Sequence, residues 1–258
     1  MELELAGKTA FVSGSTQGIG FAIAQALADE GVSVTINGRD EGRVRSAVER
    51  LGAGARGLVA DFGDPEQVKR LLAELGHVDI LVNNVGLFEV APFDAVTDDA
   101  WQRYFDVNVM SGVRLSRHLL PGMLGRGWGR VIFISSESGV NVPADMVHYG
   151  TTKAGMLALG NGLAKLTRGT GVTVNSILGG PTFSDGVAGA VAHIADAQGM
   201  DADALKAAII GGNATSLLQR FIDPAEIASL AVYLASPVSS ATNGAALRAD
   251  GGVLTGVL

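Results

Sequence analysis

The stretch Thr9-Ala10-Phe11-Val12-Ser13-Gly14-Ser15-Thr16-Gln17-Gly18-Ile19-Gly20 decides the fold of this chain. A short apolar run, residues 9–13, leads into a glycine-rich turn and then into a helical pattern over residues 19–30. Glycines let a backbone approach a phosphate closely, and a helix N-terminus offers N–H groups and a positive dipole end. This is the strand–turn–helix context of a dinucleotide site. The spacing is G-x-x-x-G-x-G, not G-x-G-x-x-G, and the turn alone is weak evidence because tight strand–helix turns need glycine anyway.

The alternation of short apolar runs and helical patterns continues along the chain. Strands are expected at residues 9–13, 32–37, 57–60, 79–83, 130–135, 172–177 and 245–248, and helices at 19–30, 41–51, 65–75, 98–124, 149–168 and 224–234. This rhythm predicts an α/β fold, a single doubly wound Rossmann-type domain over residues 1–258 with about seven parallel strands and helices on both faces. The Ala- and Gly-rich residues 186–212 predict one or two inserted helices. We interpret residues 186–216 as a substrate lid instead of an ordinary surface excursion.

Composition narrows the class of protein. Of the 258 residues, 47 % are apolar and 17 % charged, which allows a sizeable core. The net charge of −7 without a basic run argues against nucleic acid as a partner. The absence of cysteine excludes disulfides, thiolate catalysis and cysteine metal sites, and no metal site is predicted. The acidic N-terminus lacks an apolar signal core, and no apolar run reaches the length of a membrane span, so we expect a cytoplasmic protein.

Tyr149 and Lys153 form the second informative pattern. They are four residues apart in a predicted helix, so they share a face and the ammonium can lie beside the phenol. A neighbouring cation favours phenolate, and we therefore expect the pKa of Tyr149 to be lowered from its usual value of ~10. Ser136 closes an apolar run that is typical of a buried parallel strand, which places its hydroxyl where open α/β sheets hold ligands. The Tyr–Lys spacing alone is weak, because it also occurs on solvated helix faces.

Together, these motifs resemble the classical short-chain dehydrogenase/reductase (SDR) family, including its 3-oxoacyl-reductase-like members, over nearly the whole chain. The matching motifs are, in order, Gly14, Gly18 and Gly20; Asp61; Asn83-Asn84-Val85-Gly86; Asn108; Ser136, Tyr149 and Lys153; residues 175–181; and Asp250-Gly251-Gly252. The resemblance implies an NAD(P)-dependent oxidoreductase that transfers a hydride between the nicotinamide and a ketone or secondary alcohol.

The resemblance also assigns roles to four residues. Tyr149 would exchange a proton with the substrate oxygen, and Ser136 would hydrogen-bond the same oxygen. Lys153 would hold the nicotinamide ribose and lower the pKa of Tyr149. Asn108 would anchor a water that relays protons, or its side chain would bond to backbone and kink its helix; both interpretations stay open.

The implied cofactor contacts extend over most of the motifs. Asp61 would bind the adenine edge or cap a turn, and Phe62 would lie against the adenine ring. Ile177 and Thr182 would flank the nicotinamide. The full predicted set is Gly14, Ser15, Gln17, Gly18, Ile19, Gly20, Arg39, Asp61, Phe62, Asn83, Gly86, Tyr149, Lys153, Ile177, Thr182 and Ser184. Within it, Asn83 and Gly86 would shape the loop under the cofactor.

The end of the second strand bears on the choice of cofactor. An acid there hydrogen-bonds the ribose 2′-hydroxyl of NAD and repels the 2′-phosphate of NADP. In this chain Gly38 takes that position and Arg39, which can clamp a phosphate, follows it. NADP(H) is therefore favoured. NAD(H) is the alternative, because a shift of one residue would make Asp40 the ribose ligand instead of a helix cap.

Other functions and the substrate are less constrained. A nucleotide-binding sensor or scaffold without turnover is an alternative, which the intact set of Ser136, Tyr149, Lys153 and Asn108 argues against. A 3-oxoacyl thioester, a steroid-like ketone or a small cyclic alcohol would all suit the mostly apolar residues near the motifs. Glu137 either recognises a polar substituent or faces solvent. The resemblance also implies a homotetramer, built through residues 98–124 and 149–168 and through residues 246–258.

Overall fold

Every strand of the sheet runs parallel to its neighbours. In the computed structural model, which describes residues 2–257, the strands are β1 (Thr9–Val12), β2 (Ser33–Gly38), β3 (Arg56–Val59), β4 (Ile80–Asn83), β5 (Trp128–Ser136), β6 (Gly171–Gly179) and β7 (Ala246–Ala249). They form one seven-stranded sheet in the order β3-β2-β1-β4-β5-β6-β7. The order reverses between β1 and β4, so the loops after these strands diverge and leave a crevice at their carboxyl ends.

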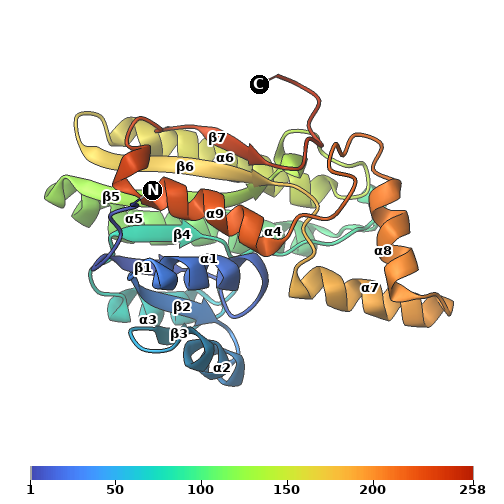
Figure 1. The fold of residues 1–258 in the computed structure, drawn as a ribbon, viewed down its shortest axis with the longest axis horizontal. Coiled ribbons are helices and arrows are strands. Elements are labelled where there is room, and N and C mark those ends of the chain that lie inside the picture. The colour runs from blue at the N-terminus through green and yellow to red at the C-terminus, as the bar shows by residue number, and fades with distance from the viewer. Residues whose placement is uncertain (1, 258) are drawn as a thin grey trace.

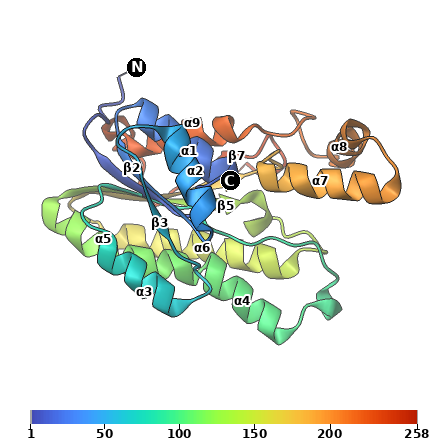
Figure 2. The ribbon, with the colours of Figure 1, turned by 90° about the horizontal axis from the view of Figure 1, so that it is seen from below.

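Helices cover both faces of the sheet (Figures 1 and 2). One face carries α1 (Gly18–Asp29), α2 (Glu41–Leu51) and α9 (Pro224–Ala235). The other carries α3 (Pro65–Glu74), α5 (Met110–Arg126) and α6 (Val147–Leu166), with α4 (Asp98–Asn108) packed beside α6. Three short 3₁₀ turns, η1 (Phe93–Ala95), η2 (Glu137–Gly139) and η3 (Pro237–Ser239), lie in the connections. The doubly wound Rossmann-type fold predicted from the sequence is confirmed.

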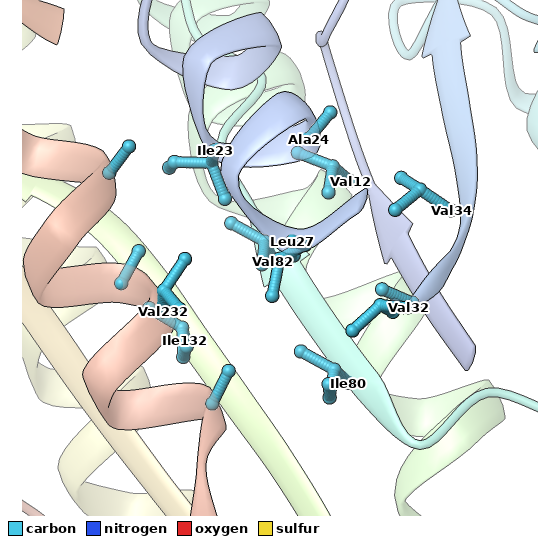
Figure 3. Packing of buried hydrophobic residues seen from close by; sticks show 14 of the residues in the cluster. Val12, Ile23, Ala24, Leu27, Val32, Val34, Ile80, Val82, Ile132 and Val232 are labelled. Carbon is cyan, nitrogen blue, oxygen red and sulfur yellow. The ribbon is translucent and has the colours of Figure 1, made fainter. Parts of the chain in front are cut away.

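The two faces draw on alternate side chains of the same strands. In β1, Ala10 and Val12 point into the core beneath α1 and α9, whereas Phe11 points into the opposite core. Figure 3 shows the first core, where Ile23 and Leu27 of α1 meet the strands. Burying a side chain of this size stabilises a fold by roughly 1.5–3 kcal/mol. The continuous apolar runs of the central strands therefore follow from burial on both sides.

Two segments refine the predicted elements. The single helix expected over residues 98–124 is interrupted at Val109, which divides it into α4 and α5. The Ala- and Gly-rich stretch forms two helices, α7 (Asp185–Gln198) and α8 (Ala202–Gly211), which project past the carboxyl edge of the sheet (Figure 1). Over residues 2–257, no helix combines the length and the apolar character needed to cross a membrane.

Candidate active site

The glycine-rich turn after β1 is packed against the loop that follows β4. Gly14 and Gly18 both have φ of +60°, a conformation that favours glycine. A Cβ on Gly14 would lie 2.9 Å from the Cα of Val85, and a Cβ on Gly20 would collide with the side chain of Asn84. The glycines are therefore needed both for the shape of the turn and for the close approach of the second loop.

Asn84 holds these two loops together, a role that sequence reasoning missed. Its Nδ2 donates to the carbonyls of Ser13 at 3.0 Å and Gly14 at 2.8 Å. The Ser13 hydroxyl in turn accepts from the backbone N–H groups of Asn84 and Val85. The preceding Asn83, predicted to shape this loop, is buried and its side-chain amide has no hydrogen-bond partner. The Asn83-Asn84 pair indicates a side-chain amide at this loop, but the sequence does not reveal which of the two amides bonds to the glycine-rich turn.

The amino end of α1 suits an anionic group. Its N-cap residue, Gln17, makes no side-chain cap, and no acidic residue lies in the first turn of the helix. The N–H of Gly18 donates instead to a carboxylate oxygen of Asp185, at the start of α7, over 2.6 Å. A dinucleotide diphosphate would be held by this turn through the same backbone donors. The glycine cradle and the lack of acid in the first turn fit such a group.

Ser15 does not offer its side chain to a ligand. It is fully buried, its hydroxyl donates to the Val12 carbonyl at 2.6 Å, and the same oxygen accepts from the N–H of Asn37. A cofactor contact of Ser15, which stays a prediction, would therefore use its backbone and not its hydroxyl. The side chain instead connects the turn to the ends of β1 and β2. This structural role cannot be recognised from the sequence, because short polar residues are common in turns.

A cleft of about 720 Å³ opens beside the turn, over the carboxyl ends of β1 to β4. Its lining is Gly14, Thr16, Gln17, Asn37, Gly38, Arg39, Asp40, Arg43, Ala60, Asp61, Phe62, Gly63, Asp64, Gln67, Val85, Gly86, Leu87, Arg103 and Val107. As predicted, β2 ends at Gly38 and exposed Arg39 follows. Asp40 caps α2 by accepting from the N–H of Arg43 at 2.8 Å. The carboxylate nearest the strand end is thus occupied as a helix cap, and Arg43 adds a second cation to the cleft.

Two predicted ring contacts conflict with the burial of the side chains. Phe62 borders the cleft, but its ring is 2 % exposed and packs in the core beneath α3 and α5. Ile177 is fully buried in the opposite core and presents no surface to a nicotinamide. Asp61 lies in the cleft, and its Oδ1 accepts from the N–H of Gly63 at 2.8 Å, the turn-capping bond that sequence reasoning left open.

The end of β5 and the start of α6 bring the three central residues of the motif together. Ser136 is the last residue of β5, and Tyr149 and Lys153 lie in the first two turns of α6. Gly139 and Gly150 allow this approach: a Cβ on Gly139 would lie 2.9 Å from the Ala154 nitrogen, and one on Gly150 would lie 2.7 Å from the Ser138 carbonyl. The serine segment therefore packs directly against the helix backbone.

The protonation states of Tyr149 and Lys153 differ from the sequence expectation. Burial raises the pKa of Tyr149 to about 12, against the opposing effect of a hydrogen bond with Ser136. Burial also lowers the pKa of Lys153 to about 8. The Lys153 ammonium donates to the Ile134 carbonyl at 2.9 Å and lies 5.6 Å from the centroid of the Tyr149 ring. The pKa of Tyr149 is therefore raised in this structure and not lowered as expected, because burial and the negative charge of Glu137 outweigh the hydrogen bond with Ser136, and the phenol keeps its proton.

Asn108 joins α4, α6 and the loop after β4. Its Oδ1 accepts from the N–H of Leu87 at 2.7 Å, and its Nδ2 donates to the Leu87 carbonyl and to the Thr152 hydroxyl. The helix is interrupted at the next residue, which matches the predicted side-chain-to-backbone bond at a kink. A Cβ on Gly86 would lie 3.5 Å from both Asn108 Oδ1 and Lys153 Nζ, so these two polar groups border the same point of the loop.

The residues that precede α7 border the glycine-rich turn of the site. The Thr182 hydroxyl donates to the Gly180 carbonyl at 2.9 Å, and Ser184 caps α7 through its side-chain oxygen. A Cβ on Gly18 would lie 3.3 Å from the Cβ of Ser184, so the start of the inserted helices touches the glycine turn. The inserted segment is in this way connected to the amino end of α1.

One family model matches this chain, and many known proteins resemble it, among them the following three. The model, described as short chain dehydrogenase, matches residues 8–194. The "Uncharacterized oxidoreductase YvrD" of Bacillus subtilis (strain 168) is 44 % identical over 98 % of this chain and 99 % of that protein. The D-beta-hydroxybutyrate dehydrogenase of Cupriavidus necator is 32 % identical over 96 % and 98 %. The structure of L-sorbose reductase from Gluconobacter frateurii, complexed with NADPH and L-sorbose, has a TM-score of 0.94 at 29 % identity and covers 100 % of both chains.

Proposed function

This chain belongs to the short-chain dehydrogenase family, and from that premise we propose that it reduces a ketone with NADPH, with Tyr149 as the proton donor. It is an NAD(P)-dependent oxidoreductase that acts on a keto or alcohol group of a small molecule. We propose three further properties of this oxidoreductase: the direction of its reaction, its preference for NADP over NAD and the roles of individual residues. A sensor or scaffold without turnover is not favoured, because the relatives are named as oxidoreductases and reductases.

The state of Tyr149 is the observation that carries the proposed direction. Tyr149 holds its proton at neutral pH, because burial raises its pKa to about 12, so the proton that reduction of a carbonyl requires is present on the phenol. The group that accepts this proton is the carbonyl oxygen, on which negative charge develops as the hydride arrives. Ser136 lies at the end of β5 beside the start of α6, and its hydroxyl would hold the substrate oxygen as negative charge develops on it. When bound, NADPH supplies the hydride to the carbonyl carbon. Lys153 would hold the ribose hydroxyls, and Asn108 would position a water beside Lys153.

Four features at and just after the end of β2 support the preference for NADP. Gly38 leaves no carboxylate at the strand end, and exposed Arg39 follows it at the cleft. Arg43 lines the same cleft one helical turn further on, and Asp40 is engaged as the cap of α2. Two guanidinium groups that line the cleft, with the nearest carboxylate engaged as a helix cap, would attract a 2′-phosphate.

Calorimetric titration with NADPH and NADH tests this proposal directly. Wild type should bind NADPH at least about tenfold more tightly than NADH, a difference of about 1.4 kcal/mol. Arg39→Ala should remove most of that difference. Arg45→Ala, which deletes the same charge from an exposed position of α2 outside the cleft, should leave it intact. Equal or tighter binding of NADH by wild type would contradict the NADP preference, and failure to bind either dinucleotide would contradict the proposed function.

We also propose that copies of the chain associate through α5 and α6. These helices border an apolar groove of about 320 Å³. The groove is lined by Val113, Ser116, Arg117, Leu120, Pro121, Leu124, Leu159, Leu163 and Leu166. Leu166 is 62 % exposed, and an apolar face of this kind is stabilised when a second copy covers it. The homotetramer implied by the family resemblance would use this face for one of its interfaces.

A further inference from the structure

The carboxylate of Glu137 lies against the hydroxyl of Ser136. The serine Oγ donates to Glu137 Oε2 over 2.9 Å, and the N–H of Ser138 donates to the serine oxygen at 3.1 Å. Glu137 is the first residue of the short turn η2, which packs against α6 beside Tyr149. The carboxylate of this half-buried residue is therefore held beside the Ser136 hydroxyl, which favours recognition of a polar substituent over the solvent-facing interpretation of the sequence.

The Ser136 hydroxyl cannot serve Glu137 and a substrate at the same time, because a hydroxyl has one proton to donate. When Ser136 donates that proton to a carbonyl oxygen instead, Glu137 loses one hydrogen-bond donor. Its hydrogen bond with the side chain of Ser138 remains. A simple ketone offers nothing in exchange. Its reduction therefore leaves a half-buried carboxylate oxygen without its partner, which disfavours that substrate.

No basic side chain compensates Glu137 among residues 2–257. The nearby charged group that acts on it is Asp250, another acid, and burial together with Asp250 raises the pKa of Glu137. Arg248 is engaged elsewhere: its Nε donates to Asp250 at 3.1 Å, and its Nη1 donates to the carbonyl of Gly256. The site thus has an acceptor in need of a donor next to the catalytic serine.

We infer that Glu137 selects ketones that carry a hydroxyl group on the carbon next to the carbonyl. The hydroxyl donates to Glu137 in place of Ser136, while Ser136 and Tyr149 hold the adjacent carbonyl oxygen. One substrate then satisfies both groups, because its carbonyl oxygen accepts from Ser136 while its neighbouring hydroxyl donates to Glu137, whose carboxylate lies 2.9 Å from the serine oxygen. This inference rests on the proposed ketone reduction and names the substrate class for it.

The chemistry of the proposed step is balanced without a further reactant. NADPH gives a hydride to the carbonyl carbon, Tyr149 gives a proton to the carbonyl oxygen, and the products are NADP⁺ and a vicinal diol. The neighbouring hydroxyl keeps its proton throughout and acts only in binding. Tyr149 regains a proton from solvent after the diol leaves.

Matched substrates that differ by one hydroxyl provide the test. We expect wild type to reduce 2-hydroxycyclohexanone with a kcat/KM about 10²-fold above that for cyclohexanone, because a site built around a substrate hydroxyl rejects the analogue that lacks it. Glu137→Ala should bring this ratio to within about threefold of unity, mainly through loss on the hydroxyketone. Glu89→Ala should preserve the ratio, because Glu89 is exposed on the loop after β4 and contacts Tyr104, not Ser136. A wild-type ratio near one, or an unchanged ratio in Glu137→Ala, would overturn the inference.

A binding measurement separates this inference from the proposed function. The vicinal diol trans-cyclohexane-1,2-diol cannot react with protein that is saturated with NADPH, so calorimetry reports its affinity without turnover. Wild type should bind the diol at least about tenfold more tightly than cyclohexanol, and Glu137→Ala should bind the two alike. If wild type loaded with NADPH binds the diol and cyclohexanol equally, only the proposed role of Glu137 is contradicted, and the proposed function still stands. Failure to bind NADPH contradicts the proposed function itself.

Discussion

The environment of Lys153 disfavours the charged form of its side chain. The residue is 5 % exposed, its ammonium donates to the Ile134 carbonyl, and burial lowers its pKa from 10.5 to about 8. The folded chain thus holds this proton less tightly than the unfolded chain, which makes the charge destabilising below pH 8. This penalty fades as the pH rises from 8 towards 10.5. A residue that costs stability at the reacting centre is expected where function requires it.

Replacing Lys153 should therefore separate stability from activity. Lys153→Met is expected to raise the free energy of unfolding at pH 7 by up to about 3 kcal/mol, since one pKa unit corresponds to about 1.4 kcal/mol. Reductase activity should be lost in the same variant. Chemical denaturation at pH 7 and pH 9.5 measures the effect, and the gain should be smaller at the higher pH. A variant that is less stable than wild type at pH 7 would show that the Lys153 charge is well solvated.

Tyr149 offers a complementary test of the acid. Tyr149→Phe keeps the ring and its edge-to-face contact with Phe88, whose centroid is 6.5 Å away, but removes the proton. We expect kcat for ketone reduction to fall by about 10²–10⁴-fold, the range of a positioned general acid. The affinity for NADPH, measured by fluorescence titration, should change by less than about threefold. A variant that retains most of its kcat would assign proton donation to another group.

Side-chain burial explains which site residues sequence could predict. Ser136, Tyr149 and Lys153 follow from spacing, because a helix face and a strand end are fixed by local periodicity. Phe62 and Ile177 could not be placed in the same way. Each lies beside a polar motif residue, and only the packing of the completed sheet decides that its side chain enters a core.

At the scale of elements, the strands and most helices followed from the alternation of apolar runs with helical patterns. The break between α4 and α5 did not, because the residues around Val109 continue a helical pattern. The interruption follows Asn108, whose side chain bonds to Leu87 and Thr152 on two other elements. Contacts of that range have no signature in a local window of sequence.

The helix α7 is joined to the glycine turn by one short bond, from the N–H of Gly18 to Asp185 at 2.6 Å. The carboxylate thereby uses a backbone donor that a diphosphate would need, and it adds negative charge beside it. Asp185→Ala is expected to tighten NADPH binding by about three- to tenfold, measured by calorimetry at low ionic strength.

The matched control for this prediction is Asp196→Ala, which removes the same charge from an exposed position of the same helix. Its affinity for NADPH should stay within about twofold of wild type. Weaker binding by Asp185→Ala would mean that this carboxylate supports the bound state of the site instead of competing with the cofactor.

At the scale of the whole molecule, the groove between α5 and α6 predicts association. Leu166→Glu places a charge on that apolar face and should shift sedimentation in analytical ultracentrifugation towards the monomer. Val238→Glu, at an exposed apolar position on η3, is the control and should sediment like wild type. A wild-type chain that sediments as a monomer at micromolar concentration would contradict the proposed assembly.

The strand order also bears on how the chain is made. The first three strands, in the order β3-β2-β1, form a unit that leaves one edge of β1 open, and β4 pairs there through Ala10 and Ile80. From β4 onwards, each new strand adds to the edge left by its predecessor, so the order in space repeats the order of translation. The growing sheet can thus extend as the polypeptide leaves the ribosome, with one edge waiting at each stage for the next segment to be synthesised.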